Sequence, residues 1–120
     1  MNSKTKILMI DDDEQIRALV QDFLQSQGYQ VLLAEDGLLG MDLLQKETVD
    51  LLILDIRLPY VSGIGLVKIA KQNMPELPII CITGYGLSPE TIAEQEKADL
   101  ILSKPFDLQE LLRSIQNLIK

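Results

Sequence analysis

The stretch Leu51-Leu52-Ile53-Leu54-Asp55 indicates the fold more directly than any other part of the chain. Four apolar residues in a row, without alternating polar residues, are typical of a strand buried on both faces of a parallel sheet. Four further short runs have the length of strands and are mostly apolar throughout. They lie at residues 7–10, 31–34, 79–82 and 100–102.

Segments with helical spacing separate these runs. Between residues 16 and 24 the apolar positions recur at intervals of three and four, and Gly28 follows as a C-terminal stop. Residues 108–119 repeat the pattern, and Asp107 with Glu110 predicts a capping box at its start. Weaker helical patterns cover residues 36–46, 64–72 and 88–96.

Five strands that alternate with five helices predict an α/β fold, a (βα)5 doubly wound parallel five-stranded sheet. We expect residues 1–120 to form this single domain, because 120 residues bury a sizeable core but are too few for two domains. The last predicted helix reaches the end of the sequence, so we expect no effector domain within these 120 residues.

The composition excludes several classes of protein. A net charge of −7 argues against direct nucleic-acid binding, and the absence of histidine excludes Ser-His, Cys-His and His-metal chemistry. The single cysteine, Cys81, lies in an apolar run, so we predict a buried, inert thiol and no intrachain disulfide. No apolar stretch approaches the roughly 18 residues of a membrane helix, and residues 1–6 lack the apolar core of a signal peptide. We therefore expect a cytoplasmic protein without membrane contact.

Polar residues stand at the carboxyl ends of four of the five predicted strands. In an open parallel sheet, ligands bind outside these ends, where the strand order reverses. Acids, a hydroxyl, a glycine amide and a lysine therefore converge on one edge. These residues are Asp11, Asp12 and Asp13 after the first run, Asp55 after the third, Thr83 and Gly84 after the fourth, and Lys104 after the fifth.

This set of side chains favours phosphoryl chemistry with a metal ion. Crowded carboxylates repel one another, so they need protons or a cation, and oxygen ligands alone suit Mg²⁺. Lys104 and the metal would neutralise a phosphoryl group, while the Thr83 hydroxyl and the Gly84 N–H could bind its oxygens. Asp55 is the candidate nucleophile, because a carboxylate can form an aspartyl phosphate without help from histidine.

Each feature also has a simpler interpretation. Asp12 with Gln15, or Asp11 with Glu14, could form a capping box at the start of a helix. Asp55 and the Thr83-Gly84 pair could be ordinary turn residues, and Lys104 a solvated charge before a bend. Their joint placement at four strand ends favours a site over these separate interpretations.

Four stretches, in one order along nearly the whole chain, carry a resemblance to a known family. They are Asp11-Asp12-Asp13 after the first strand, Asp55-Ile56-Arg57-Leu58-Pro59 with Ser62-Gly63, Ile82-Thr83-Gly84-Tyr85-Gly86, and Ser103-Lys104-Pro105-Phe106. The pattern resembles the receiver family of two-component response regulators. The resemblance implies a flavodoxin-like sheet of strand order 2-1-3-4-5, with Asp55 phosphorylated from the phosphohistidine of a partner.

The resemblance also implies the roles of the surrounding residues. Asp12, Asp55 and the backbone carbonyl of Arg57 would bind Mg²⁺, with Asp11 holding a metal-bound water. Thr83 would bond a phosphoryl oxygen, Lys104 would pair with the phosphoryl charge, and the Lys104-Pro105 peptide would be cis.

The implied partners are a sensor histidine kinase or histidine phosphotransfer protein and a downstream effector protein or domain. The donor would dock near the first helix and the loop after the fifth strand. The output would pass through the surface of the fourth helix, fifth strand and fifth helix, and a phosphorylation-linked homodimer is left open. The domain would be regulatory rather than an enzyme. Ile101 occupies a position where the family usually carries an aromatic residue that moves on activation, and Lys97 stands where a glycine is frequent.

Two alternatives follow from the same fold. A pseudo-receiver would keep the fold and signal without phosphate, and the Ile101 departure is consistent with it. An enzyme, such as a flavin-binding redox protein or an aspartate-nucleophile phosphatase, is disfavoured. The acids after the first strand would repel a flavin phosphate, and Arg57 stands where a phosphatase needs a second acid.

Overall fold

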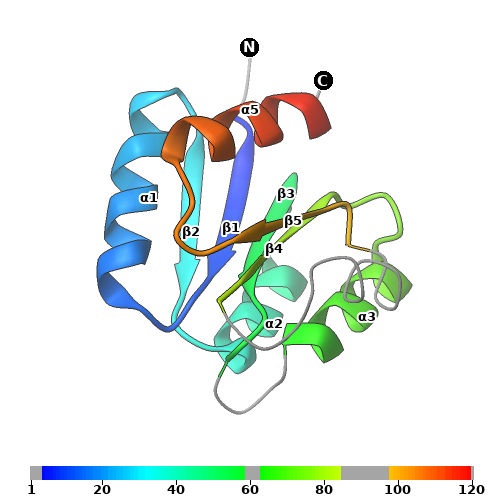
Figure 1. Ribbon diagram of the computed structural model, residues 1–120. Coiled ribbons are helices and arrows are strands. Elements are labelled where there is room, and N and C mark those ends of the chain that lie inside the picture. Colours follow the sequence, from blue (N-terminus) through cyan, green and yellow to red (C-terminus); the bar gives the residue numbers. More distant parts are fainter. Residues whose placement is uncertain (1–3, 59–62, 85–97, 120) are drawn as a thin grey trace.

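The computed structural model describes residues 4–58, 63–84 and 98–119, and in them a parallel sheet lies between two layers of helices (Figure 1). The strands are β1 (Lys6–Ile10), β2 (Gln30–Ala34), β3 (Leu51–Asp55), β4 (Ile79–Thr83) and β5 (Leu100–Ser103). The helices of this part of the chain are α1 (Glu14–Ser26), α2 (Gly37–Lys46), α3 (Gly63–Asn73) and α5 (Leu108–Leu118).

The strand order is β2-β1-β3-β4-β5, and all four pairs of neighbouring strands are parallel. This confirms the parallel doubly wound sheet that the sequence pattern predicts and the flavodoxin-like strand order that the resemblance implies. The apolar runs have the expected physical cause, because β3 and β4 are buried at every position and β1 at every position after Lys6.

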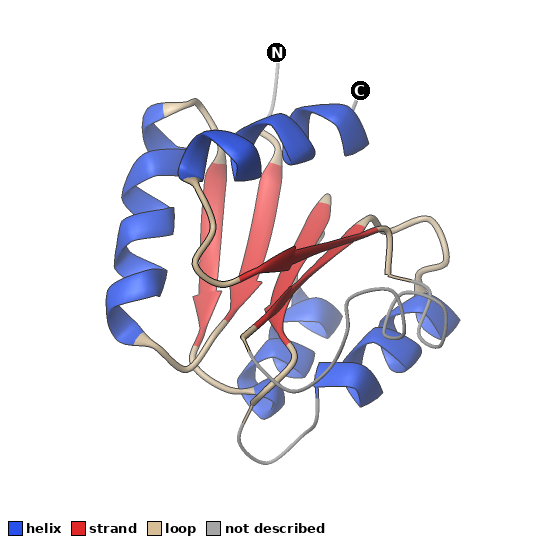
Figure 2. Ribbon diagram, viewed as in Figure 1, coloured by secondary structure: helices blue, strands red, loops and turns tan. Residues whose placement is uncertain are grey.

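Helices cover both faces of the sheet (Figure 2), and each face has its own core of buried side chains. On one face, Ile7, Met9 and Ile53 pack with the apolar sides of α1 and α5. On the other face, Leu8 and Leu52 pack with residues of α2 and α3. Successive side chains of a strand point to opposite faces, so an uninterrupted apolar strand serves both cores. The buried thiol of Cys81 belongs to the second core, as predicted.

Helix α1 begins and ends with well-defined caps. The N-cap is Asp13, whose Oδ1 accepts hydrogen bonds from the backbone N–H of Gln15 at 2.9 Å and of Ile16 at 3.2 Å. The sequence-based alternatives, a cap at Asp11 or Asp12, are wrong. The Asp11 N–H still donates to the carbonyl of Ala34 in β2, so the chain leaves the sheet one residue later than a cap at Asp11 requires.

The predicted stop at Gly28 is confirmed. Gly28 has a φ of +96°, a conformation that favours glycine. Its N–H donates to the carbonyl of Gln25, and the N–H of Tyr29 donates to the carbonyl of Leu24. These two bonds form a Schellman motif, which satisfies the last carbonyls of the helix. At the other end of the chain Asp107 caps α5 as predicted, with its Oδ1 accepting from the Gln109 N–H at 2.8 Å. The return bond from Glu110 that a capping box requires is absent from the described residues, so that part of the prediction is wrong.

The weak helical patterns at 36–46 and 64–72 correspond to α2 and α3. Gly40 of α2 contacts the sheet so closely that a Cβ would lie 2.2 Å from the Cδ1 of Ile10. The predicted helix at 88–96, and Lys97, lie outside the described residues. Among the described residues, no helix is both long enough and apolar enough to cross a membrane.

Candidate metal and phosphoryl site

Three carboxylates meet at the carboxyl edge of the sheet. Ile10 of β1 pairs with Leu54 of β3, so Asp11, which directly follows β1, and Asp55, the last residue of β3, come side by side. Asp12 joins them from the following turn, and one oxygen of each carboxylate lies within 4.8 Å of the others. The convergence that the sequence predicts is therefore present for these three residues.

Asp11 is buried and only partly satisfied. Its side chain is fully inaccessible to solvent. The Oδ1 atom accepts a hydrogen bond of 2.8 Å from the backbone N–H of Asp13, whereas Oδ2 has no hydrogen-bond partner in the described part of the chain. The Lys104 Nζ forms an ion pair with this oxygen at 3.3 Å. A buried carboxylate oxygen that has an ion pair but no hydrogen bond is costly, which makes this atom a candidate ligand.

Asp55 ends β3 and is held by two donors. The Arg57 backbone N–H donates to Oδ1 at 2.9 Å, and the Lys104 Nζ donates to Oδ2 at 2.8 Å. The turn after Asp55 packs tightly onto α3, since a Cβ on Gly63 would lie 2.6 Å from the backbone oxygen of Asp55. This close approach explains a glycine at the first residue of α3 and fixes the backbone behind the carboxylate.

Lys104 reaches the acids from the far edge strand. Its Nζ lies 2.8 Å from Asp55 Oδ2 and 3.3 Å from Asp11 Oδ2. The Lys104 N–H donates to the carbonyl of Thr83 at 2.8 Å, which ties the end of β5 to the end of β4. The following Lys104-Pro105 peptide bond is cis.

The charges of the site shift two pKa values. Burial raises the pKa of the Asp11 carboxyl above its ordinary value, against the lowering effects of the Asp13 hydrogen bond and the Lys104 charge. For Lys104, partial burial by itself would lower the pKa. The hydrogen bond to Asp55 and the charges of Asp11 and Asp55 together outweigh burial and raise it. Lys104 thus stays protonated as the counterion of the acids.

The remaining predicted residues lie around this centre. Thr83 is buried at the end of β4, one residue beyond the Asp55–Ile82 pair, and a Cβ added to Gly84 would meet nothing within 4 Å. Ile101 is half-buried, pairs with Cys81 and packs against the core that contains it. Among the described residues it packs with that apolar core, and it does not belong to the carboxylate cluster.

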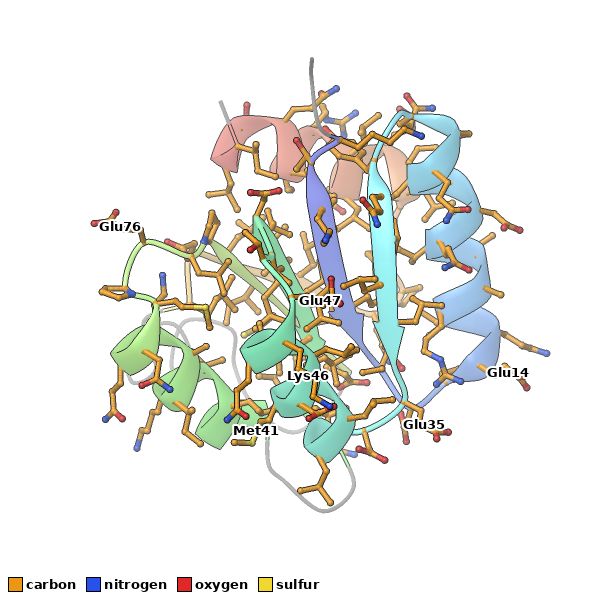
Figure 3. All side chains as sticks on the ribbon, turned by 180° about the vertical axis from the view of Figure 1, so that it is seen from behind. Glu14, Glu35, Met41, Lys46, Glu47 and Glu76 are labelled. Carbon is orange, nitrogen blue, oxygen red and sulfur yellow. The ribbon has the colours of Figure 1, made fainter. Side chains whose placement is uncertain are left out.

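The donor set fits Mg²⁺. The three carboxylates offer only oxygen, one of them the unbonded Asp11 Oδ2, and Asp12 is exposed enough for the ion to keep several waters. Asp11, Asp12 and Asp55 would hold the ion, which would add positive charge beside Lys104. Figure 3 shows that Glu14, the first residue of α1, and Glu35, in the turn after β2, also lie at this end of the molecule, so the rim is acidic as well.

Two features of the site are not visible in the sequence pattern. Arg17 Nη1 donates to the backbone carbonyl of Asp11 at 2.6 Å. Beside Lys104, an apolar groove of about 420 Å³ opens between α1 and the β5–α5 loop. Its walls include Ile16, Leu19 and Phe106. The helical period marks Ile16 and Leu19 as core residues, yet Leu19 is 57% exposed in the described chain.

Comparison with known proteins gives a consistent result. Residues 7–116 match the family model described as response regulator receiver domain. The chain is 34% identical over 116 residues to the transcriptional regulatory protein CpxR of Escherichia coli K12, covering 96% of this chain and 49% of that protein. It is 33% identical to the response regulator MprA of Mycobacterium avium, covering 96% and 51%. The chain therefore spans about half the length of these curated relatives.

Solved structures agree with the fold. A response regulator receiver domain protein from Clostridium thermocellum superposes with a TM-score of 0.89 at 31% identity, covering 96% of this chain and 94% of that one. The chemotaxis response regulator CheY4 of Vibrio cholerae gives a TM-score of 0.88 at 31% identity, covering 97% and 99%.

Proposed function

The chain belongs to the response regulator receiver family, and we propose that it accepts a phosphoryl group on Asp55 from a phosphohistidine in a Mg²⁺-dependent reaction. The observation that carries the proposal is the buried, unbonded Asp11 Oδ2 beside Asp55 and Lys104. Such an arrangement is short of positive charge. A bound metal ion would supply that charge and, together with Lys104, would neutralise the negative charge of a phosphoryl group.

The proposed transfer forms one bond and breaks one. A carboxylate oxygen of Asp55 attacks phosphorus, the P–N bond to the donor imidazole breaks, and the imidazole nitrogen keeps the electron pair. Mg²⁺ would supply charge neutralisation on the phosphoryl oxygens. Lys104 exchanges its bond with Asp55 for one with the phosphoryl group, and the Thr83 hydroxyl and the Gly84 N–H bond other oxygens. The Arg57 carbonyl would complete the protein ligands of the ion.

The donor in this proposal is a sensor histidine kinase or a histidine phosphotransfer protein. It docks on the groove between α1 and the β5–α5 loop, which is apolar and opens directly beside Lys104. A partner that fills the groove brings its phosphohistidine to the acid cluster. The domain, residues 1–120, acts as a regulatory switch rather than an enzyme, catalyses only its own phosphorylation and dephosphorylation, and works in the cytoplasm.

Phosphorylation adds about −1.5 to −2 charges at the sheet edge. Thr83 and Lys104 move toward that charge and, because Lys104 follows β5, the surface of the expected helix 88–96, β5 and α5 shifts. With Ile101 in the aliphatic core, the shift is a repacking of aliphatic side chains rather than the swing of an aromatic ring. The shifted surface controls an effector protein or domain.

The test is the mass of the intact protein after incubation with acetyl phosphate, with and without Mg²⁺. We expect a gain of one phosphoryl group that requires Mg²⁺ and is lost in Asp55→Asn. Asp36→Asn is the control: Asp36 is the half-buried N-cap of α2 and, because asparagine also caps helices, this variant should label like the parent. Label that persists in Asp55→Asn would exclude Asp55 as the acceptor. A parent protein that takes no label from acetyl phosphate or from phosphorylated histidine donors would contradict the proposal and favour a pseudo-receiver.

A further inference from the structure

The turn between β1 and α1 is held by a side chain that the proposed transfer does not use. Arg17, in the second turn of α1, donates a hydrogen bond of 2.6 Å from Nη1 to the backbone carbonyl of Asp11. The side chain is half-buried, and the bond spans six residues of sequence. A guanidinium donor is always charged, so this is a strong hydrogen bond.

The carbonyl that Arg17 binds belongs to the peptide that joins Asp11 to Asp12. A peptide unit is planar, so fixing its oxygen fixes the directions in which both flanking residues leave it. Asp11 and Asp12 are also two of the three members of the carboxylate cluster. The Arg17 contact therefore controls how the two neighbouring carboxylates stand relative to each other.

The other polar atoms of Asp11 are held as well, with one exception. Its N–H donates to the carbonyl of Ala34 at 3.1 Å, and its Oδ1 accepts from the N–H of Asp13 at 2.8 Å. Oδ2 is left without a hydrogen bond in the described chain and lies 3.3 Å from the Lys104 Nζ. A residue held at every other polar atom presents this one oxygen in a fixed position.

We propose that Arg17 is a positioning residue for the cation site, which it preorganises by fixing the Asp11–Asp12 peptide. This inference rests on the proposed function, which supplies the cation. Residues that orient metal ligands without touching the metal typically change metal affinity by about 10- to 100-fold when they are removed. Arg17 would orient two acids at once, Asp11 and Asp12, because both flank the peptide that it binds.

The charge of Arg17 acts in the opposite direction to its positioning effect. A guanidinium near the site repels a divalent cation, so charge alone would make Mg²⁺ bind more tightly after its removal. The side chain is partly exposed, and solvent screens such a charge. A misdirected carboxylate, by contrast, loses direct contact with the ion. Positioning therefore outweighs repulsion.

The test is the dissociation constant of Mg²⁺ for the unphosphorylated protein, measured by titration calorimetry. Arg17→Met keeps the length of the side chain without its donors, and Arg17→Lys keeps the charge without the planar fork. Arg113→Met removes an exposed arginine of α5 and is the matched control for loss of one positive charge. We expect the dissociation constant to rise about 10-fold in Arg17→Met, less in Arg17→Lys and not at all in Arg113→Met.

A spectroscopic readout separates positioning from a general loss of stability. In the metal-free protein the amide NMR signal of Asp12, whose peptide carries the bonded carbonyl, should shift in Arg17→Met and keep its place in Arg113→Met. Unchanged or tighter Mg²⁺ binding by Arg17→Met would overturn the proposal. If that variant does not fold, the same affinity for Arg17→Lys as for the parent would overturn it.

The parent titration distinguishes this inference from the proposed function. A parent protein that binds no Mg²⁺ would overturn the cation site and the Arg17 role together. Mg²⁺ binding by the parent that is insensitive to both Arg17 substitutions would overturn the Arg17 role alone and leave phosphorylation of Asp55 standing.

Discussion

At the amino ends of β4 and β5 the charged groups are paired, whereas at the carboxyl ends of β1 and β3 the carboxylates outnumber the side-chain cations that pair with them. Asp99, just before β5, accepts hydrogen bonds from the Ile79 N–H at 2.7 Å and the Lys71 Nζ at 2.9 Å. Lys71 also donates to the carbonyl of Leu77 at 2.9 Å. This paired network joins α3, β4 and the start of β5.

At the opposite edge, Asp11 and Asp55 share the single ammonium of Lys104, and Asp12 lies next to them. One fully buried oxygen, Asp11 Oδ2, has no hydrogen-bond partner in the described chain. Polar groups that only support a fold are normally satisfied within it. The contrast indicates that the Asp99–Lys71 network stabilises the domain, whereas the carboxylate cluster lowers its stability but leaves oxygen atoms available to a ligand.

The largest expected effect comes from adding Mg²⁺, which would supply the positive charge that the carboxylate edge lacks. At a Mg²⁺ concentration 100 times its dissociation constant, the free energy of unfolding should rise by about 2.7 kcal/mol, because the ion binds the folded state. Urea denaturation with and without Mg²⁺ measures it. Asp12→Asn, which weakens the site at an exposed position, should lose most of the rise. The same rise in parent and variant would place the ion elsewhere.

The next largest effect comes from removing Asp99, the acceptor of the paired network at the amino ends of β4 and β5. Asp99→Ala removes the acceptor of two hydrogen bonds, one of them from a lysine, and should lower the free energy of unfolding by about 2 kcal/mol. Glu76→Ala is the control, because Glu76 lies in the nearby turn and points away from the body of the protein (Figure 3). It should change stability by less than about 0.5 kcal/mol. Equal effects would show that the Asp99 network contributes nothing.

The smallest effect comes from removing the buried charge of Asp11. Unlike the Asp99 substitution, it should raise the free energy of unfolding. Without Mg²⁺, Asp11→Asn should raise the free energy of unfolding by about 1 kcal/mol, because it removes a buried charge and keeps an oxygen to accept from the Asp13 N–H. Urea denaturation in metal-free buffer measures the change. A loss of stability would mean that attraction to Lys104 outweighs the cost of burial.

The pH dependence gives an independent check on Asp11. Its pKa is raised from an ordinary value of 3.8, so the folded state holds this proton more firmly than the unfolded state. The resulting stabilisation is complete below pH 3.8 and is lost as the pH rises through the folded-state pKa. The advantage of Asp11→Asn over the parent should therefore shrink as the pH is lowered toward 4. An advantage that does not vary with pH would contradict the burial of a charged Asp11.

Most of the fold could be predicted because its signals are local. An apolar run such as 79–82 reports burial on both faces, and the ends of β4 differ from the predicted run by a single residue. Gly28 and Asp107 act through the backbone within a few residues of themselves, so the stop of α1 and the cap of α5 were predictable. The weaker pattern over α2 has a long-range cause at Gly40, which contacts Ile10 of β1.

The sequence by itself also determined which residues share the site edge, because parallel strands place their carboxyl ends together whatever their separation along the chain. Only the tertiary structure decided how each of them is used. Asp13 rather than Asp11 or Asp12 caps α1, since hydrogen bonding to β2 carries the chain one residue further. The hydrogen bond of Arg17 to the Asp11 carbonyl and the pairing of Lys71 with Asp99 require atoms from different elements to meet within about 3 Å. The absence of a hydrogen bond at Asp11 Oδ2 in the described chain is likewise decided by which donors the fold brings near it. Hydrogen bonds and ion pairs at that range depend on side-chain positions that no local pattern in the sequence specifies.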